Sequence, residues 1–187
     1  MFLQGRVVTL RALETEDLDF VRDLINDPEV ESTIVGWSWP KPRKEQEQWF
    51  MDYVNSEKKV RYIIETVAEG RVGITGLRNI DWKNGSASGA GIRIRKDVQS
   101  KGLATDAYMT LFRYAFEELR LHRINTSAFE DNVPSLRFLE KCGCKREGLQ
   151  REAVYKGGRY RNLVTLAVLD RDYFEVANTY FEYTMYQ

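Results

Sequence analysis

The stretch at residues 94–105, IRKDVQSKGLAT, combines residue types and a spacing that suit the binding of a phosphate group. A predicted strand ends near Arg95 and the apolar stripe of a long helix begins at Leu103, so the residues between them form a strand-to-helix turn. Free backbone N–H groups at a helix N-terminus attract an anion, Gly102 permits close approach of the backbone, and Lys101 adds a cation. The turn therefore has the properties of a pyrophosphate site, although it contains no Walker motif. The alternative is an ordinary strand-to-helix turn.

The elements that position this turn follow from the hydrophobic periodicity. Strands are predicted over residues 6–11, 60–67, 72–77, 87–95, 123–128, 148–155 and 160–169. Helices are predicted over residues 18–25, 44–57, 103–119 and 134–141. The order indicates an α/β (α+β) fold with a mixed, mostly antiparallel sheet of about seven strands flanked by about four helices.

Composition excludes several classes of protein. The chain has 187 residues with 28 Lys plus Arg against 28 Asp plus Glu, so its formal net charge is 0, and a nucleic acid or an anionic membrane is not expected as partner. Two cysteines and one histidine are too few for a disulfide framework or a multi-histidine metal site. No stretch approaches the ~20 apolar residues of a membrane span, and the N-terminus lacks the features of a signal peptide. We expect one domain over residues 1–187, cytoplasmic, without a metal.

Four motifs follow one another along the chain. Gln99-x-x-Gly102-x-Ala104 lies between a strand and a helix, and residues 132–135 (NVPS), 139–143 (LEKCG) and 155–160 (YKGGRY) come later. In this order they resemble the Q/R-x-x-G-x-G/A signature, the N-x-x-S/A…K-x-G-F segment and the closing hairpin of the GNAT N-acetyltransferase superfamily. The opening LRALETEDLDFV…NDPEV resembles its RimJ/RimL-type branch. Residues 158–162 and 99–105 are also similar to bacterial spermidine N-acetyltransferases.

The resemblance implies a GNAT-like fold and acetyl-CoA as co-substrate. It places the pyrophosphate on the amides of a run of residues, Gln99, Ser100, Lys101, Gly102, Leu103 and Ala104, with Thr105 nearby. The pantetheine arm would lie along Ile92, Arg93 and Ile94, like an added strand where two strands of the sheet splay apart. Asn132 and Ser135 would contact the far side of that arm. For Asn132, a helix cap ahead of Pro134 is an equal alternative.

Two positions depart from the superfamily pattern. Many members carry a tyrosine as general acid seven positions after the asparagine, where this chain has Leu139. Many also carry a glutamate on the strand before the signature, where we place Gly89. The usual acid and base therefore cannot be assigned to this chain by resemblance.

Other residues are candidates for these two roles. An alkylamine has a pKa near ~10 and needs a base or a desolvating site to become a nucleophile. Glu130 and Asp131, after a predicted strand, are candidates for a direct or water-mediated base, with two solvated carboxylates in a turn as the alternative. Ser135 or Tyr160 is a candidate to orient a water or to protonate sulfur, and a backbone N–H within residues 93–95 is the expected oxyanion donor.

Three functions remain open at this point. The first is acetyl-CoA-dependent N-acetyl transfer to a primary amine, either a protein N-terminus or a small molecule. The second is polyamine acetylation of the spermidine type, which the positive charge of Lys41 and Arg43 disfavours. The third is a non-catalytic acyl-CoA-binding module, consistent with the missing tyrosine and glutamate. The aromatic segment at residues 180–187 is expected to cover a sheet edge or to join two copies in a homodimer.

Overall fold

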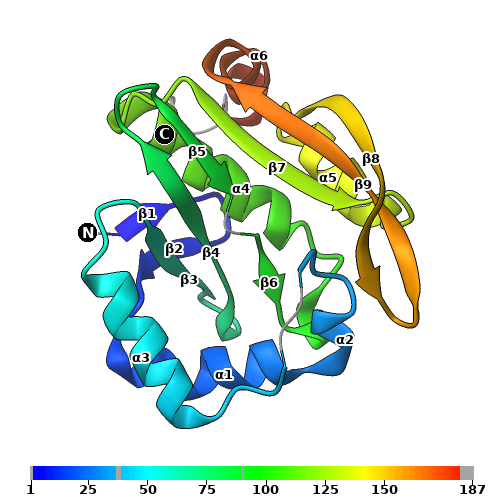
Figure 1. Cartoon of the computed structure of the whole chain (residues 1–187). Coiled ribbons are helices and arrows are strands. Elements are labelled where there is room, and N and C mark those ends of the chain that lie inside the picture. The colour runs from blue at the N-terminus through cyan, green and yellow to red at the C-terminus, as the bar shows by residue number, and fades with distance from the viewer. Residues whose placement is uncertain (1, 37–38, 90, 182–187) are drawn as a thin grey trace.

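The structure, a computed structural model, describes residues 2–36, 39–89 and 91–181 (Figure 1). Its strands are β1 (Phe2–Gln4), β2 (Thr9–Ala12), β3 (Val60–Thr66), β4 (Gly70–Asp81), β5 (Ser86–Gly89), β6 (Arg93–Ile94), β7 (Arg123–Phe129), β8 (Lys145–Lys156) and β9 (Arg159–Leu169). Its α-helices are α1 (Leu18–Asn26), α2 (Pro28–Glu31), α3 (Arg43–Val54), α4 (Leu103–Arg113), α5 (Val133–Lys141) and α6 (Asp170–Phe181). Short 3-10 turns, η1 (Thr15–Asp17) and η2 (Lys96–Val98), precede α1 and α4, and a π-helical segment, η3 (Tyr114–Glu118), continues α4.

The described strands form one sheet in the order β1-β2-β3-β4-β5-β7-β9-β8, with β6 paired to β4. Every pair is antiparallel except β5 with β7, which is parallel. The prediction of a mixed, mostly antiparallel sheet with helices on both faces is confirmed. The numbers of strands and helices were underestimated, because β1, the one-turn helix α2 and the C-terminal helix α6 were not predicted.

The first predicted strand, residues 6–11, begins later than expected. The backbone N–H groups of Arg6, Val7 and Val8 donate to the carboxylate of Asp106 on α4, at 3.0, 2.8 and 2.9 Å. These amides are therefore not available to a neighbouring strand, and β2 starts at Thr9. A buried carboxylate far away in the sequence, which no local pattern reveals, sets this boundary.

The strand predicted over residues 87–95 is divided in two. β5 pairs with β7 through Ser86, Ala87 and Ser88, whereas β6 pairs with β4 alone. β4 continues along both pieces, so β6 and β7 diverge beyond Ser88 while α4 passes behind the opening (Figure 1). This divergence creates the place where a ligand can lie between two strands.

Two apolar clusters hold the helices on opposite faces of the sheet. The larger joins α4, α5 and α6 to the sheet and includes Phe112, Ile94 and Tyr173. The smaller joins α1, α2 and α3 to the other face and includes Ile63 and Ile74. No helix among the described residues is long and apolar enough to cross a membrane.

Candidate active site

The turn between β6 and α4 has the backbone conformation of an open anion cradle. Ser100 and Gly102 adopt positive φ angles of 65° and 79°. Gly102 is the N-cap of α4 without a side-chain cap, and the first bond of the helix runs from the Asp106 N–H to the Gly102 carbonyl at 3.1 Å. The preceding amides of the first turn are therefore left for a ligand. A Cβ built on Gly102 would meet nothing within 4 Å, so the space in front of the turn is open.

Side chains of the turn support it rather than project from it. The Gln99 side chain donates to the Ile94 carbonyl at 2.9 Å, which holds the turn against β6. Lys101 forms a salt bridge with Glu69 at 3.2 Å. Leu103 is buried in the larger apolar cluster, so only its backbone is available to a ligand. Ala104 and Thr105 follow in the first turn of α4, and both are half-buried.

The edge of β6 offers hydrogen bonds toward the opening. The N–H of Arg95 donates to the Val72 carbonyl of β4 at 2.8 Å. Because successive N–H groups of a strand point to opposite sides, the N–H of Ile94 points away from β4, into the gap beside β7. Within residues 93–95, where an oxyanion donor is expected, the Ile94 N–H is therefore the one that faces the opening.

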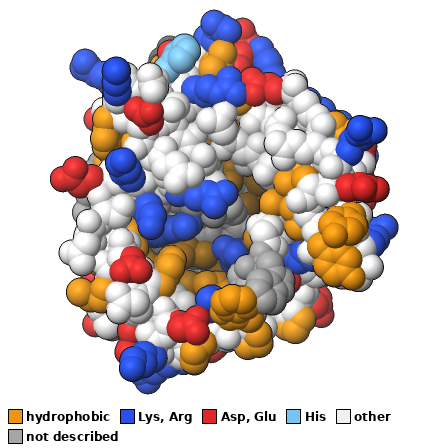
Figure 2. Space-filling view, in the orientation of Figure 1, with side chains coloured by type: hydrophobic (Ala, Val, Ile, Leu, Met, Phe, Trp, Pro, Cys, Tyr) orange, Lys and Arg blue, Asp and Glu red, His pale blue; other side chains and the backbone are white. Residues whose placement is uncertain are grey.

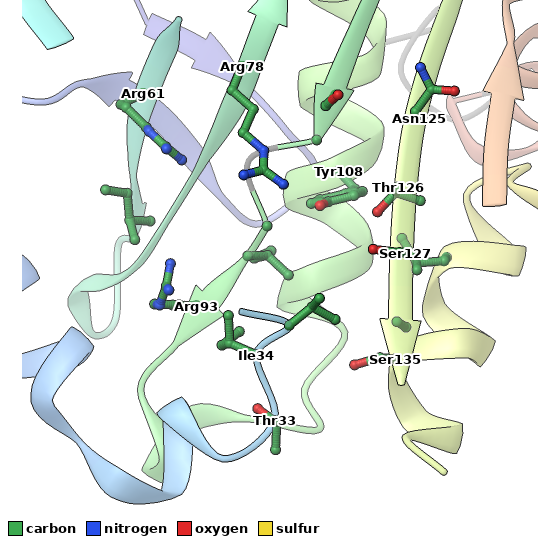
Figure 3. Close-up of a pocket in the computed structure, with 18 of the residues that line it drawn as sticks. Thr33, Ile34, Arg61, Arg78, Arg93, Tyr108, Asn125, Thr126, Ser127 and Ser135 are labelled. Carbon is green, nitrogen blue, oxygen red and sulfur yellow. The ribbon is translucent and has the colours of Figure 1, made fainter. Parts of the chain in front are cut away.

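A cavity of about 610 Å³ occupies the opening and extends beneath α1 and α3. Of the residues predicted to bind a cofactor or to act in catalysis, Ile92, Arg93 and Ser135 line it. Figure 3 shows its two walls: Arg61, Arg78 and Arg93 come from β3, β4 and β6, and Tyr108, Asn125, Thr126, Ser127 and Ser135 face them from α4, β7 and α5. One wall is therefore cationic and the other is rich in hydroxyl groups.

Arg61, Arg78 and Tyr108 were not predicted, and Arg93 was expected only along the pantetheine arm. Arg61 and Arg78 stand two and four residues from Ile63 and Ile74 along their strands, so they share the covered face of the sheet. This alternation is a signal that the sequence contains. Burial, together with Arg93 and Arg78, lowers the pKa of Arg61 to about 10. The guanidinium groups of Arg78 and Arg93 are therefore close enough to repel that of Arg61.

The carboxylates predicted as bases lie elsewhere. Asp131 forms salt bridges with Arg159 at 2.7 Å and with Arg161. Its hydrogen bond with Arg161 lowers the pKa of Asp131, and it lines a shallower neighbouring depression. Glu130 accepts a hydrogen bond from Asn162 at 2.8 Å and does not line the cavity. Both carboxylates therefore lie outside the lining of the cavity, with Asp131 paired to two arginines and one oxygen of Glu130 bonded to the β8–β9 hairpin, and this placement disfavours them as bases.

Asn132 caps α5, which is the structural alternative considered from the sequence. Its Oδ1 accepts from the Ser135 N–H at 3.2 Å, and its Nδ2 donates to the Thr33 carbonyl at 3.2 Å. The cap places Ser135 at the cavity wall, while Asn132 itself lines the neighbouring depression. Tyr160, the other proton-donor candidate, is exposed and makes an edge-to-face contact with Tyr155 outside the cavity. No cluster of three or more metal-ligating side chains occurs in the part of the chain that the structure describes.

The chain is similar to known proteins in sequence and in fold. Residues 8–145 match the family described as acetyltransferase (GNAT) domain. The chain is 27% identical to the spermidine N(1)-acetyltransferase of Vibrio cholerae over 169 residues, 89% of this chain and 95% of that protein. It is 29% identical to the uncharacterized N-acetyltransferase p20 of Bacillus licheniformis, over 89% of this chain and 94% of that one. The crystal structure of the Vibrio cholerae enzyme in complex with CoA and spermine superposes with a TM-score of 0.84 at 27% identity, covering 89% of this chain and 98% of that one.

Proposed function

Because this chain belongs to the acetyltransferase (GNAT) domain family, it is an N-acetyltransferase, and we propose that it transfers the acetyl group of acetyl-CoA directly to a primary amine. The observation that carries the proposal is the junction of the open cradle at Gly102 with the divergence of β6 and β7. It provides an anion site, a strand edge and a cavity in one continuous path. We place the chain in the RimJ/RimL-type branch on its N-terminal motif, and we treat residues 1–187 as one domain.

Acetyl-CoA fits the residues of this path. The pyrophosphate would accept hydrogen bonds from the free amides of residues 100–105, because the Gln99 N–H already donates to the Lys96 carbonyl at 3.3 Å. The pantetheine arm would lie against the open edge at residues 92–94. Ser135 lies on the other side of the opening and is placed to contact the arm. Because the Asn132 side chain caps α5, Asn132 would contribute to cofactor binding by positioning Ser135.

Direct acetyl transfer does not require a strongly acidic side chain. The amine nitrogen bonds to the thioester carbon, the carbon–sulfur bond breaks, the nitrogen loses a proton and the sulfur departs. The developing oxyanion would be stabilised by the Ile94 N–H. A thiol pKa near ~8.5 makes the sulfur a tolerable leaving group, so a hydrogen bond from Ser135 or Tyr108 can replace a strong acid.

A polyamine acceptor is the second candidate. It is favoured by the similarity to the spermidine N(1)-acetyltransferase of Vibrio cholerae, in sequence and in the structure with CoA and spermine. The three arginines of the cavity disfavour it, since a polycation and guanidinium groups repel one another. A homodimer stays a proposal from the aromatic C-terminal segment, of which residues 182–187 lie outside the described part of the chain.

The test is acceptor-dependent release of thiol from acetyl-CoA by the purified protein, with spermidine, N-terminal peptides, small amines and no acceptor compared at equal concentration. Release that requires an amine supports the proposal. Tight CoA binding without release to any amine would instead indicate an acyl-CoA-binding module.

A substitution at Gly102 tests the cofactor site separately. Gly102→Glu places a carboxylate in the cradle and is expected to weaken acetyl-CoA binding by about tenfold or more through like-charge repulsion. Gly158→Glu is the matched control, because Gly158 has the same φ of 79° and equally open surroundings, on the β8–β9 turn. Equal Kd values for both variants, measured by calorimetry, would refute the assignment of the cradle.

A further inference from the structure

The cationic wall of the cavity belongs to the acceptor side, not to the phosphate cradle. Arg93 is paired in register with Ile74, which packs in the apolar cluster beneath α1 and α3. The neighbouring Ile94 packs with α4 in the cluster on the opposite face. Side chains alternate between the faces of a strand, so Arg93 points away from the helix whose N-terminus forms the cradle. Arg61 and Arg78 share its face.

The carboxylates that the structure describes around Arg78 and Arg93 are bound to other cations. Glu45 and Glu147 also line the cavity, but Glu45 pairs with Lys41 at 2.9 Å and Glu147 pairs with Arg123. Glu31, the carboxylate that acts on Arg93, is held by Lys156 at 2.7 Å. Among the described residues, neither Arg78 nor Arg93 forms a salt bridge. Figure 2 shows Lys and Arg side chains gathered around the hollow at the centre of this face.

We infer that the acceptor is a small amine that also carries an anionic oxygen group, a carboxylate or a phosphate, bound by Arg61, Arg78 and Arg93. The inference rests on the proposed acetyl transfer and names the substrate class of that site. Guanidinium groups bind carboxylate and phosphate oxygens through paired, charge-assisted hydrogen bonds. An anion bound between the three guanidinium groups also offsets their mutual repulsion.

The size of the acceptor follows from the position of Arg93. It directly precedes Ile94, whose N–H points to the reacting carbonyl in the proposed transfer. The anionic group and the amine must therefore lie within one small molecule, such as an amino acid or an amino-alkyl phosphate. The same guanidinium groups disfavour a protonated amine nearby, which helps to supply the neutral nucleophile without a carboxylate base.

Matched pairs of acceptors test the inference. Amino acids are compared with their amides, and phosphoethanolamine with ethanolamine, alongside spermidine, by thiol release at saturating acetyl-CoA. We expect kcat/KM to favour the anionic member of at least one pair by about tenfold or more, and the favoured pair distinguishes carboxylate from phosphate. Equal or better transfer to the amides, ethanolamine or spermidine overturns the inference and leaves the acetyltransferase intact. Release with no acceptor at all overturns both.

Variants locate the effect in the arginine wall. Arg78→Gln and Arg93→Gln are expected to raise KM for the anionic acceptor by about tenfold to a hundredfold, and Arg78→Gln is expected to leave the Kd for acetyl-CoA unchanged. Arg78→Glu is expected to shift the preference toward spermidine. Arg78 is solvent-exposed, so its variants do not depend on a buried contact for folding. Arg171→Gln, on the exposed surface of α6, is the control and is expected to match the wild type. An unchanged ratio of anionic to uncharged acceptor in Arg78→Gln contradicts the inference.

Discussion

Tyr108 occupies the space that a side chain on Gly89 would need. A Cβ on Gly89 would lie 3.3 Å from the Tyr108 hydroxyl and 3.7 Å from the Thr126 hydroxyl. Tyr108 is 1% exposed, and burial raises its pKa, so the hydroxyl stays protonated and can donate a hydrogen bond but not act as a base. A glutamate at this position would press its Cβ against the Tyr108 hydroxyl, and Leu139 leaves the tyrosine position apolar. Tyr108 is the phenol that this chain presents to its cavity.

Replacing Tyr108 with phenylalanine tests this residue. Tyr108→Phe removes one hydrogen-bond donor beside the opening, so kcat is expected to fall about three- to tenfold while KM for acetyl-CoA stays unchanged. Steady-state thiol release measures both constants. Tyr173→Phe is the control: that buried hydroxyl bonds Glu117 at 2.7 Å, outside the cavity, so its loss affects stability and not turnover. If kcat of Tyr108→Phe equals that of the wild type, the Tyr108 hydroxyl has no role in turnover.

At the scale of elements, the turn η1 fastens α1 to the sheet. Asp17 accepts from Arg11 on β2 at 2.6 and 2.7 Å, from the Glu14 N–H at 3.0 Å and from Arg71 on β4 at 3.3 Å. Burial raises the pKa of Asp17, but the bonds from Arg11, Glu14 and Arg71 outweigh it, so the pKa lies below its usual value. Because α1 covers part of the cavity, the bonds of this carboxylate position a wall of the site.

The lowered pKa predicts how stability depends on pH. A carboxylate whose pKa falls on folding stabilises the protein above its unfolded value of ~3.9, and this contribution is lost as pH falls through the folded pKa. Asp17→Asn is expected to cost about 1.5–3 kcal/mol in unfolding free energy at pH 7, with the difference from wild type shrinking below pH ~4. Urea unfolding at a series of pH values measures this. Asp19→Asn, whose side chain is 58% exposed, serves as the control, and a pH-independent difference for Asp17→Asn contradicts the assignment.

Across the whole molecule, Lys156 ties the closing hairpin to the segment after α2. Its ammonium group donates to the carbonyls of Glu31 and Ile34 at 2.6 Å each, to the Gly36 carbonyl at 3.0 Å and to the Glu31 carboxylate at 2.7 Å. The side chain is 8% exposed. Residues 33–35 line the cavity, so the hairpin supports the acceptor side from a distance of more than a hundred residues in sequence.

Lys156→Met tests this connection. Three carbonyls lose a charged donor, so the unfolding free energy is expected to fall by about 1–3 kcal/mol, and KM for the acceptor is expected to rise while Kd for acetyl-CoA stays unchanged. Denaturant unfolding, calorimetry and steady-state kinetics report the three quantities. Lys96→Met removes an exposed salt bridge of 3.6 Å to Glu29 and is the control. If KM for the acceptor rises equally in both variants, the contacts of Lys156 with residues 31–36 do not shape the site.

The sequence by itself determined the features that depend on nearby residues. The periodicity of residues 103–119, the Gly157-Gly158 turn of the closing hairpin and the run from Gln99 to Thr105 are local patterns, and each produced the expected element. The order of motifs was sufficient for the acetyltransferase family, because that order reflects the whole chain.

Only the tertiary structure decided which side chains share the cavity. The division of the strand at residues 87–95 depends on the different partners of β5 and β6, and the loss of Asp131 as a base depends on Arg159 and Arg161 from the hairpin. The arginines of β3, β4 and β6 meet because sheet register brings them to one face. Hydrogen-bond register and ion pairs join residues far apart in the chain, so these contacts exist only once the whole sheet has assembled.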